Sequence, residues 1–160
     1  MSQKLLPSGH LLEIFMPYRK DEARMLDVLR KAVKLNFYKG VELGVFFDRY
    51  NQIYVRDILG QNKLNGTTFV TPCLKEQKLS LSDLDADHRK KALELVRQLA
   101  DRAAACGYTN FGIPSGDDPG DAKREEAKKV LADSMVKIAD YCKTLGLNLT
   151  LEPLDRYAYK

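Results

Sequence analysis

The chain has 160 residues and a formal charge of +4, with basic residues spread along predicted helices rather than gathered in a block. Its length suits one domain with a sizeable core, but a complete eight-stranded βα barrel takes about 250 residues. The weak charge argues against a nucleic-acid-binding protein, and the lack of a run of about 18 apolar residues argues against a membrane span. The three cysteines show no paired spacing and no secretory signal pattern is visible, so we expect free thiols and a cytoplasmic protein.

Alternation, helical periodicity and breaker residues predict five strands separated by helices. The predicted strands are Leu11–Met16, Val41–Gly44, Thr67–Thr71, Tyr108–Ile113 and Leu147–Glu152. The predicted helices run from about Asp21 to Lys39, around Tyr50–Ile58, from the Ser80–Asp85 cap cluster to Gly107, and through Ala127–Cys142 to Gly146. The last two helices each end in a glycine, the residue that favours the left-handed turn closing a helix.

This order of strands and helices predicts a parallel sheet with right-handed crossovers. Two architectures fit it: an open, doubly wound sheet of the flavodoxin type, or the first five strands of a TIM barrel. Three strands alternate apolar and polar residues, which favours a barrel, because strands covered by helices on both faces are almost continuously apolar. The Met16–Lys20 turn also lacks the glycines of a phosphate-binding loop. We therefore predict a single α/β domain over residues 1–160, a parallel (βα)n partial TIM barrel.

The last predicted strand carries a functional signal at its end. Its leucines share one face, which we expect the strand to bury, and its polar residues share the other, because side chains alternate along a strand. Pro153 follows Glu152 and stops the strand. The carboxyl ends of parallel strands are where ligands bind in such folds, so Glu152 is a candidate site acid, with a solvated loop acid as the alternative.

Five short motifs fall in order along nearly the whole chain. They are Gly40–Gly44, Leu81–Arg89, Ala103–Gly107, Ser115–Pro119 and Leu151–Arg156. Together they resemble sugar phosphate isomerases and epimerases of the xylose isomerase-like TIM-barrel superfamily. The resemblance covers the N-terminal five-eighths of such a barrel, so it implies strands one to five.

The resemblance also implies a divalent metal ion, Mn²⁺, Mg²⁺, Co²⁺ or Zn²⁺. In this family the glutamate that ends the fifth strand is a metal ligand and also acts as acid or base near the sugar carbon, and Glu152 stands at that position. The other ligands come from strands six to eight, so we expect the isolated chain to bind metal weakly and to turn over little substrate. Arg156 is a candidate contact to a substrate hydroxyl or phosphate, or else a partner for a neighbouring acid. Tyr157 and Ala158 follow it where some epimerases carry a further glutamate.

One further acid is a candidate site residue, whereas the two histidines of the chain are not. Glu42 ends the second predicted strand, so it is a candidate substrate contact, with a buried hydrogen-bonded acid as the alternative. His10 precedes the first predicted strand and His88 begins a helix. Both histidines are therefore expected at the surface, away from the site.

The function favoured by these observations is a metal-dependent isomerase or epimerase of a sugar or sugar phosphate, of which the chain is the N-terminal part. The alternative is a non-catalytic α/β half-barrel module that self-associates or binds a partner. An abasic-site endonuclease of the same superfamily is disfavoured, because neither a basic groove nor a set of histidine and acidic ligands is visible. An open barrel leaves its first and last strands unpaired, so we expect a homo-oligomer.

Overall fold

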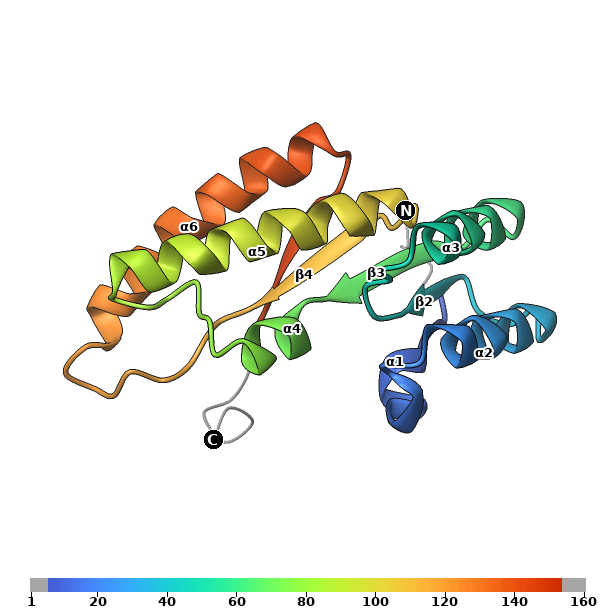
Figure 1. The fold of residues 1–160 in the computed structure, drawn as a ribbon, viewed down its shortest axis with the longest axis horizontal. Helices are drawn as coiled ribbons and strands as arrows, with labels where there is room; N and C mark the ends of the chain where they lie inside the picture. The colour runs from blue at the N-terminus through green and yellow to red at the C-terminus, as the bar shows by residue number, and fades with distance from the viewer. Residues whose placement is uncertain (1–5, 154–160) are drawn as a thin grey trace. The chain divides into compact units, whose positions relative to one another are not determined.

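The structure is a computed structural model that describes residues 6–153. Strands and helices alternate along the chain (Figure 1). The strands are β1 (Ser8–His10), β2 (Gly40–Glu42), β3 (Asn65–Phe69), β4 (Asn110–Pro114) and β5 (Asn148–Glu152). The helices are α1 (Leu11–Ile14), the 3-10 helix η1 (Met16–Tyr18), α2 (Glu22–Lys34), α3 (Arg49–Gln61), α4 (Thr71–Glu76), α5 (Ala86–Ala105) and α6 (Arg124–Thr144).

Aspartates and glycines mark the helix ends as the sequence indicates. Asp21 precedes α2, Asp48 precedes α3 and Asp85 precedes α5, and each carboxylate accepts first-turn N–H groups at 2.9 or 3.0 Å. These N–H groups, that of His88 foremost, hold the pKa of Asp85 below its usual value. Gly107 and Gly146 follow α5 and α6 with a φ of +71°, a conformation that costs glycine little because it has no Cβ.

The strands form one five-stranded sheet in the order β1-β2-β3-β4-β5. The strands are parallel, as the predicted class requires. A flavodoxin-like sheet has the order 2-1-3-4-5, because its chain reverses direction across the sheet. The consecutive order therefore excludes that alternative and is the order of a barrel segment, in which β1 and β5 are the edges.

The prediction of a first strand over Leu11–Met16 is wrong, because β1 covers Ser8–His10 and the next residues form α1 and η1. Leu11 and Leu12 are both buried, whereas neighbours in a half-buried strand point to opposite faces. β1 escaped prediction because it is short and contains Gly9, against which a tyrosine ring packs 3.0 Å from the position of a Cβ. It therefore lacks the apolar alternation that identifies strands.

The third strand lies two residues earlier than predicted. β3 ends at Phe69, and Thr71 begins α4. Pro72 lies in the first turn of α4, where the missing N–H of proline costs nothing. The proline therefore marks the start of a helix and not the end of the strand itself.

The chain divides into two compact units. The N-terminal unit is Met1–Thr68 with Arg102–Asn110, and the C-terminal unit is Phe69–Asp101 with Phe111–Lys160. In the N-terminal unit, α2 packs against α3. In the C-terminal unit, α5 and α6 run side by side on the same side of β4 (Figure 1). The single domain over residues 1–160 stays a prediction.

In the N-terminal unit the expected alternation is visible in β2, where Val41 is fully buried and the next residue, Glu42, is only partly buried. β4 does not alternate in this way, because Phe111, Gly112, Ile113 and Pro114 are all buried and only Asn110 is partly exposed. Within residues 6–153, no helix is long and apolar enough to cross a membrane.

The leucine face of β5 is less buried than predicted. Leu147 is buried just before the strand, but Leu151 is 40% exposed. β5 is an edge strand, and such a strand has a neighbour on one side only. The expectation that the strand buries its whole apolar face is therefore wrong.

Candidate functional site

Four polar side chains of the N-terminal unit lie across β1 to β4, and we call them the polar row: His10, Glu42, Thr67 and Asn110. Parallel pairing sets His10 opposite Glu42, and Glu42 opposite Thr67. Nε2 of His10 contacts Oε1 of Glu42, and Nδ2 of Asn110 donates a hydrogen bond to Oγ1 of Thr67 at 3.2 Å. Paired residues of neighbouring strands point to the same face. The polar face of this unit thus carries one side chain from each of four strands.

The expectation that His10 lies away from the site end of the strands is wrong. Because β1 ends at His10, the imidazole lies at the carboxyl end of the strand, beside Glu42. The side chain of His10 is 44% exposed and that of Glu42 is 17% exposed. A glycine directly before the histidine was the available signal, because glycine within a strand often marks close packing.

Hydrogen bonds to the backbone hold the loop that follows Glu42. The N–H of Leu43 donates to the carbonyl of Thr67 at 3.0 Å. The hydroxyl of Tyr108 donates to the carbonyl of Gly44 at 2.9 Å. Burial raises the pKa of Tyr108 well above its usual value, so the phenol keeps the proton that it donates.

Three more side chains hold the next part of this loop. Gln52 donates to the carbonyl of Phe46 at 2.8 Å, and the carboxylate of Glu22 accepts from the N–H of Phe47 at 2.5 Å. Arg102 donates to the carbonyl of Phe47 at 2.9 Å and places its guanidinium 4.8 Å from the centroid of that ring. The loop beside the His10–Glu42 pair is therefore fixed by its own chain, as pre-organised binding sites require.

The predicted site acid of the C-terminal unit has a different environment. Glu152 is the last residue of β5. The hydroxyl of Thr71 donates to its Oε2 at 2.9 Å, and its carbonyl accepts from the N–H of Ser115 at 3.2 Å. Among residues 6–153, no lysine, arginine or histidine pairs with this partly buried carboxylate. Within the described residues, the side chain is therefore oriented by a neutral donor.

The described residues do not make a complete metal site. Within them, no group of three or more histidine, cysteine, aspartate or glutamate side chains is placed to hold an ion. Mg²⁺ or Mn²⁺ prefers about six oxygen ligands and Zn²⁺ about four ligands. Glu152 supplies one carboxylate, so further ligands would have to come from outside this part of the chain.

The predicted site residues are distributed over both units. Glu42 belongs to the N-terminal unit, where the structure adds His10 to it, and Glu152 to the C-terminal unit, where the structure adds Thr71. Arg156 lies outside the described residues. His88 is at the surface as predicted, and its Nδ1 lies 3.1 Å from a carboxylate oxygen of Asp83.

Solved structures of sugar enzymes share this fold. A putative xylose isomerase from Rhodospirillum rubrum has a TM-score of 0.69 at 17% identity, over 94% of this chain and 55% of its own. A D-allulose 3-epimerase from Methylomonas sp., in complex with D-allulose, has a TM-score of 0.67 at 21% identity, over 97% and 53%. A D-psicose 3-epimerase from Clostridium cellulolyticum, with D-tagatose, has a TM-score of 0.67 at 18% identity, over 82% and 47%.

These coverages and sequence identities define how far the likeness extends. The chain spans about half the length of the solved structures that it matches. At this identity the likeness establishes the fold, with five parallel strands corresponding to part of a TIM barrel. No curated protein sequence matches the chain.

A family description is matched over most of the chain. The model of the xylose isomerase-like TIM barrel matches residues 29–160. The match begins within α2 and includes β2 to β5. With the consecutive strand order and the shared fold, it shows that the chain belongs to the xylose isomerase-like TIM-barrel family.

Proposed function

We propose that the chain is part of a metal-dependent isomerase or epimerase that acts on a sugar or a sugar phosphate, in the cytoplasm. The observation that carries this proposal is the position of Glu152. It ends a strand of a parallel sheet, Thr71 orients it, and no cation of the described residues neutralises it. The epimerases named above, solved with D-allulose and D-tagatose, support a sugar as the substrate.

Glu152 is the proposed acid–base group. Epimerisation beside a ketone removes a proton from carbon and returns one to the opposite face, so it needs two groups that exchange protons. The carboxylate of Glu152 would accept the first proton. The hydroxyl of Thr71, which donates a hydrogen bond to this carboxylate, would keep the carboxylate in the required orientation. Glu42 is a proposed substrate contact, and Arg156 is a proposed contact to a substrate hydroxyl or phosphate group.

Glu152 is also the proposed ligand of a divalent ion. When bound, such an ion polarises the carbonyl and hydroxyl oxygens of the sugar. This part of the proposal rests on family membership, because the described residues supply a single carboxylate and no complete site. The isolated chain should therefore bind Mn²⁺ weakly, and Glu152→Gln should abolish that binding in calorimetry.

Turnover tests the whole proposal. The 160-residue chain and, if the reading frame continues past Lys160, the longer polypeptide are incubated with Mn²⁺ and D-fructose, D-allulose or D-tagatose, and products are separated by chromatography. Glu152→Gln should lower turnover of the active form by at least about 100-fold, the usual worth of an acid–base group. Glu125→Gln, on an exposed part of α6, is the matched control. Equal turnover of the Glu152→Gln variant and the parent would contradict the proposal.

A second candidate, a non-catalytic module that self-associates, is supported by β5. This strand is an edge of the sheet, and its Leu151 is 40% exposed. Exposed apolar edges pair with other chains, and a lysine on the edge opposes such pairing. Light scattering after size-exclusion chromatography should show an oligomer that Leu151→Lys dissociates. A monomer at high concentration would contradict this candidate.

A further inference from the structure

The polar row offers hydrogen-bonding groups that the proposed chemistry at Glu152 does not use. Its four members come from four strands of the N-terminal unit and contact one another in pairs, His10 with Glu42 and Asn110 with Thr67. None of the four is fully buried. They therefore form a polar surface that a ligand can contact.

The His10–Glu42 pair lies at the edge of the sheet where parallel folds bind their ligands. Both residues end their strands, and the carboxyl ends of parallel strands are where ligands bind in barrels. The Glu42 side chain is mostly buried and the His10 side chain is nearly half exposed. With Nε2 in contact with Glu42, the imidazole presents Nδ1 as its second hydrogen-bonding atom. The clamped loop that follows Glu42 keeps this arrangement fixed.

We propose that His10 and Glu42, with Thr67 and Asn110 beside them, bind the hydroxyl groups of an uncharged polyol, such as the unphosphorylated end of a ketose. This inference rests on the proposed function for the chemical class of the ligand, and it concerns the N-terminal unit by itself. Imidazole, carboxylate, hydroxyl and amide together both donate and accept hydrogen bonds, as each hydroxyl of a sugar does. None of the four side chains is a lysine or an arginine, and that of Glu42 is a carboxylate, so the polar row offers a phosphate dianion no strong cationic partner and selects against a phosphorylated end.

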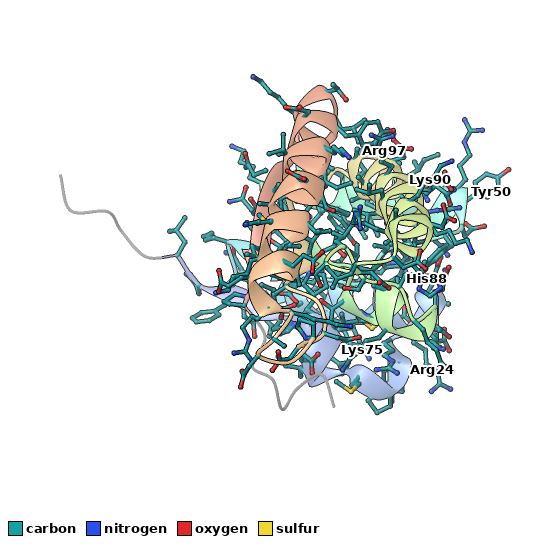
Figure 2. All side chains as sticks on the ribbon, turned by 90° about the vertical axis from the view of Figure 1, so that its left-hand side faces the viewer. Arg24, Tyr50, Lys75, His88, Lys90 and Arg97 are labelled. Carbon is teal, nitrogen blue, oxygen red and sulfur yellow. The ribbon has the colours of Figure 1, made fainter. Side chains whose placement is uncertain are left out.

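Histidine NMR tests the subsite without requiring turnover. The chain has two histidines, so its two imidazole Cε1–H signals are assigned with His10→Gln and His88→Gln. Figure 2 labels His88 at the start of α5, the helix that also carries Lys90 and Arg97. His88 is the matched control, because it too pairs with a carboxylate, that of Asp83. Titration with D-fructose should shift the His10 signal to saturation and leave the His88 signal in place.

Variants and a charged analogue separate a binding role from a structural one. D-Fructose 6-phosphate should bind at least about tenfold more weakly than D-fructose. Glu42→Gln should weaken D-fructose binding by about tenfold and narrow the difference between the two ligands, because the repelling charge is gone. If Glu42→Gln does not fold, Thr67→Val removes one hydroxyl at nearly constant shape and should also weaken binding.

The possible results decide between the two proposals. A His10 signal that moves with neither ligand, or no further than that of His88, overturns the subsite. Tighter binding of the phosphate ester overturns it as well. Binding of D-fructose at His10 without turnover by any form of the protein counts against the proposed function alone, whereas turnover with an unshifted His10 counts against the subsite alone.

Discussion

The two units each end a strand with a glutamate, but the two carboxylates have different partners. Glu42 meets the imidazole of His10, and the loop after it is held at several backbone groups. Glu152 meets the hydroxyl of Thr71 on an edge strand. Position in a strand therefore does not define the role of an acid. Because the partners differ, we propose different roles for the two residues: hydroxyl recognition at Glu42, and cation or proton binding at Glu152.

Cysteine labelling compares how strongly each unit lowers the reactivity of its buried thiol. Cys106 in the N-terminal unit and Cys142 in the C-terminal unit are fully buried. Burial raises the pKa of Cys106 from 9.0 to about 12 and that of Cys142 to about 11. The thiolate fraction at pH 8 falls tenfold for each unit of pKa, so we expect a rate reduction on the order of 1000-fold for Cys106 and 100-fold for Cys142.

Single-cysteine variants and a disulfide reagent measure these rates, with partly exposed Cys73 as the reactive control. Faster labelling of Cys106 than of Cys142 would contradict the order of thiol burial proposed for the two units.

The raised pKa of Cys106 also makes stability depend on pH. The contribution of this thiol to the free energy of unfolding is complete below pH 9.0 and is lost as the pH rises toward about 12, because the unfolded chain loses the proton first.

Two glycines test how firmly each unit holds its aromatic rings. A Cβ at Gly66 would lie 2.5 Å from the ring of Tyr108, and one at Gly112 would lie 2.1 Å from the ring of Phe69. The Tyr108 ring is pinned by its hydrogen bond to Gly44, whereas Phe69 is partly exposed. Gly66→Ala should therefore lower the free energy of unfolding by about 3 kcal/mol and Gly112→Ala by less.

Chemical denaturation measures both values. Gly60→Ala in α3 is the control, because nothing lies within 4 Å of its added Cβ, and it should stabilise the chain by about 0.5–1 kcal/mol. A larger loss from Gly112→Ala than from Gly66→Ala would reverse the order proposed for the two units.

The carboxylate of Glu22 joins the start of α2 to the start of α3. It accepts hydrogen bonds from the N–H groups of Phe47 and Asp48 and from the side-chain amide of Asn51 at 2.5–3.3 Å. Glu22→Ala should lower the free energy of unfolding by about 1–2 kcal/mol, since bonds to a charged acceptor are the stronger kind. Glu125→Ala, on an exposed part of α6, should leave it nearly unchanged, and equal losses would remove the argument for a clamped loop.

Removal of the Thr71 hydroxyl should have the smallest effect. Glu152 is only partly buried, so water can replace the hydrogen bond, and Thr71→Val should lower the free energy of unfolding by less than about 1 kcal/mol. Thermal unfolding measures this change. A loss above about 2 kcal/mol would indicate that the hydrogen bond between Thr71 and Glu152 has a structural role.

Much of the fold follows from local patterns. The aspartate before α5, the glycines after α5 and α6, and the alternation in β2 carry the class and order of the elements. The prediction of β1 failed because Gly9 packs against a tyrosine ring from another part of the chain. A strand stabilised by such a distant contact leaves no periodic signal of its own.

Part of the candidate site could be predicted from the sequence. The position of Glu152 at a strand end followed from Pro153 and from the leucines before it. The pairing of His10 with Glu42 did not, because an error of a few residues in β1 moves a side chain from one end of the sheet to the other. Thr71 was also missed, since its contact with Glu152 spans 81 residues, and nothing in one sequence indicates such a pair.

The consecutive strand order has a consequence for synthesis. Each strand pairs with the one made just before it, so a nascent chain leaving the ribosome can add one βα layer at a time to a template already in place. Domains synthesised at about 5–20 residues per second have time for such stepwise growth. A sheet of order 2-1-3-4-5 must place a later strand on the far side of an earlier one, whereas this order lets assembly follow translation.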